Sequence, residues 1–314
     1  MKKIVNCFCK KTSSGFGDFL RGSIHLYERL KNYDIDFDID LGLHPISLFI
    51  ERNSAEKYTE NEIEIIKPEN NTDDLFQNNE EMDKRLSEII DNFKKTGIKF
   101  IFSNYHYLFK IKNSKFIMNC LNEEELSQDC KAWFKSKLKF SENITKAAEK
   151  EVSSIINKEY EVIHFRLGDR SSFYKIGSEF KNTWVPDLED CWEECLEISK
   201  KQKKKMTIII MSDSNELKNY IDKKIEKESS LMKVIHKKSG HTQKKPTKSI
   251  HEELKVKKEN FFFAALDMKI LTMASRVHSF SVYFWGSGFV TWICKIFDVP
   301  ISIQPLVYKE RYLD

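Results

Sequence analysis

His164 and Arg166 have the clearest chemical potential in this sequence, and they stand two residues apart in the stretch EVIHFRLGDR. Side chains two apart on a strand point to the same face, so an imidazole and a guanidinium would lie together. Gly168 then permits the chain to turn away from the strand. A guanidinium pairs with two phosphate oxygens at once, so this arrangement suits a diphosphate. Spacing alone equally allows a structural turn, with an Arg166–Asp169 salt bridge and a buried, hydrogen-bonded His164.

A second candidate is the segment SSGFGD, which follows the first apolar stretch of the chain. Gly15 and Gly17 would let a ligand approach the backbone, and the start of the next helix offers free amides to a phosphate. The segment matches neither the Walker pattern nor G-x-G-x-x-G. A tight turn with Asp18 near the helix start explains it equally well.

Polar residues also follow later apolar segments. Ser212 and Asp213 end the run IIIMSD, at the position where a strand of an open parallel sheet meets its ligand. Ser214 is better explained as a helix cap. A further group comprises an aspartate in an apolar segment and two serines after it, Asp267, Ser279 and Ser281. The serine hydroxyls could bind phosphate oxygens or cap helices.

The elements that must position these residues alternate along the chain. Hydrophobic periodicity predicts strands at 2–9, 35–41, 61–67, 98–104, 159–166, 205–213, 231–237, 276–284 and 299–306. It predicts helices at 19–30, 78–95, 121–138, 141–157, 187–201, 214–225, 259–275 and 287–298. The lysine-rich segment 237–258 is expected to be an exposed loop, in preference to a clamp for phosphate or acceptor. The alternation predicts an α/β fold with mostly parallel sheets and helices on both faces.

Length and composition set further bounds. A chain of 314 residues suits two units, which we place at 1–150 and 151–314. The net charge of +4, from 52 cationic and 48 anionic side chains, gives no strong case for nucleic acid. Seven scattered cysteines are typical of reduced thiols. The apolar run at the N-terminus is too short for a signal peptide. No segment reaches about 18 consecutive apolar residues, so we expect a soluble cytoplasmic protein without a membrane span.

Taken in order, these motifs resemble the fucosyltransferase superfamily, which includes the α1,2-, α1,6- and protein O-fucosyltransferase-like enzymes and the bacterial nodulation type. The resemblance is nearly continuous from about residue 140 to 303 and patchy before it. It implies a GT-B fold, in which two Rossmann-like lobes with mostly parallel sheets face a central cleft, and the C-terminal lobe binds GDP-fucose. It also implies inverting transfer to a glycan hydroxyl without a required metal or cofactor.

The resemblance also implies roles for individual residues. Arg166 matches the arginine that holds the donor diphosphate, and His164 the histidine beside it. Asp267 matches the aspartate that helps to read the guanine. Further donor-binding positions are Gly15, Gly17, Asp18, Ser212, Asp213, Ser279 and Ser281. Leu167 stands where the family often has a second basic residue.

Inverting transfer needs cations near the leaving diphosphate and a base near the acceptor hydroxyl. Arg166 is the candidate for the first role, and Asp169 and Glu179 are the candidates for the second. Each carboxylate also has a structural interpretation, a turn salt bridge for Asp169 and a solvated surface position for Glu179. Two alternatives remain: a GT-B enzyme that uses another nucleotide sugar, and an inactive relative that binds nucleotide or glycan.

Overall fold

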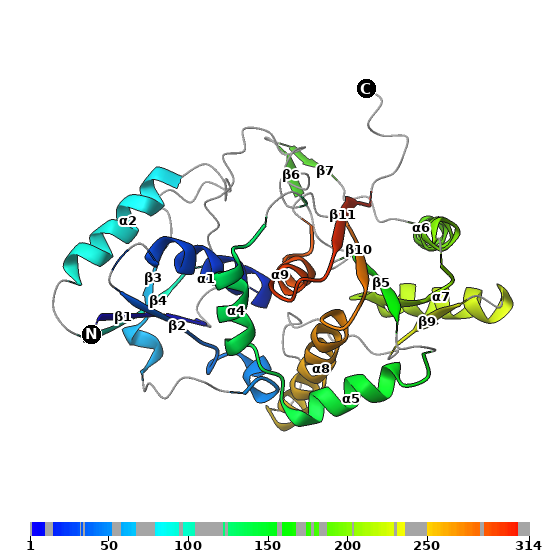
Figure 1. Cartoon of the computed structure of the whole chain (residues 1–314), viewed down its shortest axis with the longest axis horizontal. Coiled ribbons are helices and arrows are strands. Elements are labelled where there is room, and N and C mark those ends of the chain that lie inside the picture. The colour runs from blue at the N-terminus through cyan, green and yellow to red at the C-terminus, as the bar shows by residue number, and fades with distance from the viewer. Residues whose placement is uncertain are drawn as a thin grey trace.

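Two separate parallel sheets organise the chain in a computed structural model (Figure 1). The structure describes residues 2–9, 15–31, 33, 35–51, 58–66, 79–93, 97–103, 122, 125–155, 159–167, 174–176, 179–181, 187–202, 204–228, 231–235, 250–282 and 286–306. For 79–83, 174–176, 179–181 and 250–258 it describes the backbone alone. The expected α/β class with mostly parallel sheets is confirmed.

The N-terminal sheet has the order β2-β1-β4-β3, and all of its strand pairs are parallel. Its strands are β1 (Lys2–Cys7), β2 (Asp36–Asp40), β3 (Glu64–Ile65) and β4 (Gly97–Phe102). The accompanying helices are α1 (Phe16–Leu30), the short η1 (Pro45–Leu48) and η2 (Glu60–Glu62), and α2 (Asn79–Asn92). Apolar β1 takes a central place because Ile4 and Val5 are fully buried. Asn6 Nδ2 donates to Ser23 Oγ at 2.8 Å, which fixes α1 on this sheet.

The C-terminal sheet has the order β11-β10-β5-β8-β9, again with parallel pairs. Its strands are β5 (Tyr160–Arg166), β8 (Thr207–Ser212), β9 (Met232–Val234), β10 (Arg276–Ser281) and β11 (Ile301–Pro305). Its helices are α6 (Leu188–Lys201), α7 (Asn215–Glu228), α8 (Ile250–Leu271) and α9 (Gly288–Ile296).

Strand β5 lies at the centre of this second sheet and contributes side chains to both faces. Ile163 and Phe165 pack into the cluster that contains the apolar residues of α6 and α7. Tyr160 points to the opposite face, where its hydroxyl donates to the carbonyl of Ile270 in α8 at 2.7 Å. His164 and Arg166 are an even number of residues from Tyr160 along the strand. Their side chains therefore point to the same face as Tyr160, which is the face that α8 covers.

Helices lie between the two sheets and join them, as Figure 1 shows for α8 and α9. Helix α9 contacts α1 and α4 (Gln128–Lys137). Helix α8 contacts η1 and α5 (Glu142–Val152). Asn122 also binds the edge strand β11: its side chain accepts from the Ile303 amide at 2.8 Å and donates to the Ile303 carbonyl at 2.9 Å. The predicted unit boundary near residue 150 falls within α5 and stays a prediction.

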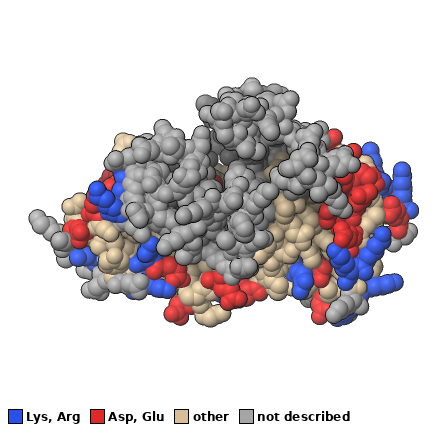
Figure 2. Space-filling model, turned by 90° about the horizontal axis from the view of Figure 1, so that it is seen from above, with Lys and Arg blue, Asp and Glu red and all other residues tan. Residues whose placement is uncertain are grey.

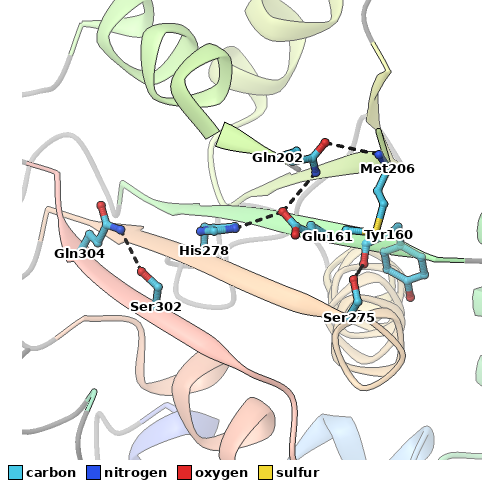
Figure 3. A network of polar contacts seen from close by, with 8 residues as sticks. All are labelled: Tyr160, Glu161, Gln202, Met206, Ser275, His278, Ser302 and Gln304. Carbon is cyan, nitrogen blue, oxygen red and sulfur yellow. Dashed lines mark hydrogen bonds and ion pairs between the residues drawn. The ribbon is translucent and has the colours of Figure 1, made fainter. Parts of the chain in front are cut away.

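A polar network near the amino ends of the C-terminal strands ties β5, β10 and the approach to β8 together (Figure 3). Glu161 Oε2 accepts from Gln202 Nε2 at 3.2 Å and lies 3.3 Å from His278 Nε2. Ser275 Oγ donates to the Tyr160 carbonyl at 2.7 Å. Since ligands of such sheets bind at the carboxyl ends, we assign this network to sheet stability.

Several predicted boundaries were wrong, and three of them are the starts of helices. Helix α1 begins at Phe16 rather than at 19, so Gly17 is helical. Helix α4 begins only at Gln128, because Ser127 caps it by accepting from the Cys130 amide at 3.3 Å. Helix α8 begins at Ile250, inside the segment expected as a loop. The glutamates, leucine and lysines of that segment are good helix formers. Its many charged and few apolar residues had suggested an exposed loop instead.

The surface and the cysteines agree with the composition. In Figure 2 cationic and anionic side chains both occur at each end of the molecule. Six cysteines of the described chain are buried thiols outside any disulfide: Cys7, Cys9, Cys130, Cys191, Cys195 and Cys294. Within the described residues, no helix combines the length and the apolar character needed to cross a membrane.

Candidate active site

Arg166 and Asp213 meet at the carboxyl ends of β5 and β8. The Arg166 guanidinium forms an ion pair with Asp213 Oδ2, and the Leu167 amide donates to Asp213 Oδ1 at 2.9 Å. One carboxylate therefore orients both the arginine side chain and the backbone that follows it. The Arg166 side chain is 30% exposed, so it also reaches the surface at this edge. Asp213 is thus an ion-pair partner of Arg166, which spacing along the sequence could not indicate. Asp169 lies outside the described residues, so the expected Arg166–Asp169 salt bridge stays a prediction.

His164 and Ser279 form a buried polar pair on the neighbouring row of the sheet. The two residues are register partners of β5 and β10, and Arg166 and Ser281 are partners two residues later. His164 Nδ1 and Ser279 Oγ are buried and have no hydrogen-bond partner among the described residues. A buried polar atom without a partner costs about 1–3 kcal/mol, so such atoms usually bind water or a ligand.

Burial dominates the electrostatics of His164. It lowers the pKa of the imidazole to about 4, although the carboxylates of Asp213 and Asp267 act in the opposite direction. His164 is therefore neutral near pH 7 and can offer one ring nitrogen as a donor or an acceptor. Asp267 is only partly buried and lies on α8, the helix that covers the His164 side of the sheet.

Lys218 is a member of this group that sequence reasoning missed. It lies in the first turn of α7 and is only 1% exposed. Burial lowers its pKa to about 8, while Asp267 and Asp213 favour its charged form. One signal was present in the sequence, because Lys218 falls on the buried stripe of α7 with Leu217 and Ile221.

Ser212 and Ser214 shape the turn that presents Asp213. The Leu217 amide donates to Ser214 Oγ at 3.2 Å, so the expected capping role of Ser214 is confirmed. Ser212 Oγ accepts from the Ser214 amide at 3.0 Å. Ser212 thus has a structural task, and its predicted contact with the donor stays a prediction.

The glycine segment lies where α1 meets α9. Gly15 precedes α1 and donates its amide to Asp18 Oδ2 at 3.2 Å, so Asp18 has the expected role at the helix start. Gly17 is buried against the first turn of α9: a Cβ at this position would lie 2.4 Å from the Phe289 nitrogen. Gly17 is therefore required for close contact between helices of the two halves.

The start of α9 offers further polar groups near Ser279. Ser287 precedes the helix, is buried and makes no side-chain capping bond. Thr291, one turn later, is 1% exposed, and its hydroxyl has no hydrogen-bond partner in the described part of the chain. Thr291 was not predicted, because a threonine within an apolar helix carries no distinct signal.

The two candidate bases are not described in atomic detail. Asp169 lies outside the described residues. Glu179 begins β7 (Glu179–Lys181), which pairs antiparallel with β6 (Tyr174–Ile176), but its side chain lies outside the described part. The described residues contain no cluster of three or more His, Cys, Asp or Glu side chains that could hold a metal ion.

Comparison with solved structures places this geometry in a known fold. NodZ alpha-1,6-fucosyltransferase soaked with GDP-fucose matches with a TM-score of 0.51 and 11% identity, over 94% of this chain and 92% of NodZ. NodZ co-crystallized with GDP matches with a TM-score of 0.50 and 13% identity, over 93% and 91%. The chain has a fucosyltransferase fold. The resemblance read from the sequence motifs is thereby confirmed for the fold, including the GT-B class.

Other comparisons add less. POFUT1 in complex with GDP aligns over 96% of this chain and 97% of its own with 13% identity, but its TM-score is 0.46, so the fold assignment rests on NodZ. No protein-family model matches the sequence, and no curated protein matches it significantly.

Proposed function

We propose that the chain is an inverting glycosyltransferase that moves fucose from GDP-fucose to a hydroxyl of a glycan. The observation that carries this proposal is the Arg166–Asp213 pair at the carboxyl ends of β5 and β8. It places a fixed guanidinium beside two buried polar atoms without described partners, His164 Nδ1 and Ser279 Oγ. The fold shared with NodZ, which was soaked with GDP-fucose, supports the choice of this donor.

In the proposed mechanism, the acceptor oxygen attacks C1 of fucose from the side opposite the diphosphate. The bond from C1 to the phosphate oxygen breaks, its electron pair leaves with GDP, and the configuration at C1 inverts. Arg166 offsets the charge that develops on the leaving diphosphate. A carboxylate, for which Asp169 and Glu179 are the candidates, takes the proton of the acceptor hydroxyl.

Binding of the donor would use both the sheet edge and α9. Ser279 and Ser281 present hydroxyls next to His164 and Arg166, and the first amides of α9 favour negative charge. Asp267 would accept hydrogen bonds from the guanine. Fixed cationic and amide donors facing the diphosphate give the leaving group its stabilisation, so we propose that no metal is required.

The location proposed for this reaction is the cytoplasm. Free thiols persist in reducing compartments, and the six described cysteines are all buried thiols outside any disulfide. Nucleotide-sugar donor and glycan acceptor are the proposed partners.

The test is nucleotide binding, measured by thermal shift with GDP, UDP, ADP and S-adenosylmethionine. A ligand at about 100 times its dissociation constant stabilises the folded state by about 2.7 kcal/mol, and we expect this only with GDP. Arg166→Ala should weaken GDP binding at least tenfold, because charge-assisted bonds contribute about 1.5–3 kcal/mol. Arg276→Ala is the matched control, since Arg276 is exposed at the amino end of β10.

Two results would contradict the proposal. One is stabilisation by UDP or ADP without stabilisation by GDP, which would point to another donor. The other is unchanged GDP affinity of a folded Arg166→Ala variant, which would remove the phosphate role of this residue.

A further inference from the structure

A buried lysine stands next to the proposed donor site, and nothing in the mechanism above uses it. Lys218 is 1% exposed, although Lys223 and Lys227 of the same helix are exposed. An ammonium group is costly to bury unless carboxylates compensate its charge.

The position of Lys218 is fixed by the turn that carries Asp213. The Lys218 amide donates to the Ser214 carbonyl at 3.2 Å, and the Ser214 amide donates to Ser212 Oγ at 3.0 Å. The first turn of α7 is therefore fastened to the end of β8. Lys218 and the Arg166–Asp213 pair consequently share the carboxyl edge of the C-terminal sheet.

Charged groups from several elements influence one another at this edge. Asp213 and Asp267 both favour the charged form of Lys218, and the same two carboxylates act on His164. Arg166 supplies the second cation of the group. Two cations and two carboxylates, with a neutral imidazole among them, form a balanced set.

We propose that Lys218 is a positioning residue of the donor site: its ammonium keeps Asp213 and Asp267 compensated, so that Asp213 can orient Arg166 toward the diphosphate and Asp267 can face the base. This inference rests on the proposed function and deepens it. Lys218 itself does not have to touch the donor, since it acts through the two carboxylates.

The charge of Lys218 gives the proposal a distinctive pH dependence. Burial brings the pKa of its ammonium from 10.5 to about 8, so the cation is present below pH 8 and is lost above it. Binding of the anionic diphosphate favours the protonated form, and GDP affinity should therefore fall as the pH rises past 8. Burial lowers the pKa of His164, which lies beside this group, to about 4, so His164 is neutral throughout this range.

The experiment is isothermal titration of GDP between pH 7 and pH 9. Wild-type affinity should hold near pH 7 and fall by up to tenfold per pH unit above pH 8, the limit for loss of one proton. Lys218→Met should bind GDP about tenfold more weakly at pH 7 and show no such fall. Lys218→Arg keeps its charge and should also lack the fall, but from an affinity near that of the wild type. Lys223→Met, at an exposed position of the same helix, should follow the wild type.

Each outcome decides a specific point. A flat wild-type profile overturns the inference without any variant, even if Lys218→Met does not fold. A folded Lys218→Met protein with wild-type affinity and wild-type pH dependence overturns it as well, while leaving the proposed function intact. Absence of GDP binding by the wild type at every pH overturns the proposed function, and this inference with it.

Discussion

Replacing Gly17 by alanine tests the contact that brings α1 against α9. The added Cβ would lie 2.4 Å from the nitrogen of Phe289 and 2.6 Å from the carbonyl carbon of Gly288. Favourable contacts begin near 3.5 Å, so the backbones of the two helices must separate by about 1 Å. Overpacking of this kind costs about 1–3 kcal/mol, and we expect the upper end because both atoms belong to backbone.

Helix propensity acts in the opposite direction and sharpens the test. Within a helix, alanine is more stable than glycine by about 0.5–1 kcal/mol. The expected net loss for Gly17→Ala is thus about 2 kcal/mol of the free energy of unfolding. For a chain of 314 residues that unfolds as one unit, with an unfolding entropy of about 2.1 cal/mol/K per residue, this lowers Tm by about 3 °C.

The assay is thermal unfolding followed by circular dichroism, with Gly15→Ala as the matched control. Gly15 has an extended backbone, and a Cβ there would meet only Asp18 Oδ2 at 3.9 Å. Its Tm should fall by only about 1 °C, since alanine is a poorer N-cap than glycine by less than about 1 kcal/mol. A Gly17→Ala protein as stable as the wild type, or more stable, would refute the close approach of α1 and α9.

Two further predictions concern stability. Burial lowers the pKa values of His44 and His164 to about 4, so the unfolded state binds more protons than the folded state between pH 6.5 and pH 4. Each histidine should therefore lower the free energy of unfolding by up to about 3 kcal/mol as the pH falls through this range. Urea unfolding at several pH values should show a shallower decline of this free energy for His164→Gln than for the wild type. An unchanged decline would contradict a buried, neutral imidazole. The third prediction is Asp298→Asn, which removes the ion pairs of Asp298 with Lys131 and Lys135 that join α4 to the end of α9. These pairs are partly exposed, so urea unfolding should show a loss of free energy of unfolding under about 1 kcal/mol per pair, and this loss should vanish in about 1 M salt. A larger loss that does not depend on salt would contradict an electrostatic role for the contact.

Local sequence was sufficient for most elements of this fold. The apolar runs that became β1, β5 and β8 were recognisable because parallel strands buried on both faces read as continuous hydrophobic segments. The capping role of Ser214 also followed from its own neighbours. Element boundaries were less certain: α8 extends to Ile250 through residues whose charge favoured a loop reading.

The candidate site was only partly accessible from the sequence. His164 and Arg166 could be placed on one face of a strand from their spacing, and the order of the motifs indicated the fucosyltransferase fold. The sequence could not show that Asp213, 47 residues from Arg166, is its ion-pair partner, because parallel pairing of β5 with β8 brings them together.

Tertiary structure alone decided the roles of Gly17 and Lys218. Glycine in a helix is unfavourable locally. No side chain fits at Gly17 because an added Cβ would lie 2.4 Å from the Phe289 nitrogen of α9. A lysine on a helix is ordinarily a solvated residue, and only the packing of α7 against the end of β8 buries Lys218. The sequence thus determined which residues could form strands, helices and caps, since those depend on near neighbours. Which distant charges and backbones meet depends on how the sheets and helices pack, and that was decided by the fold.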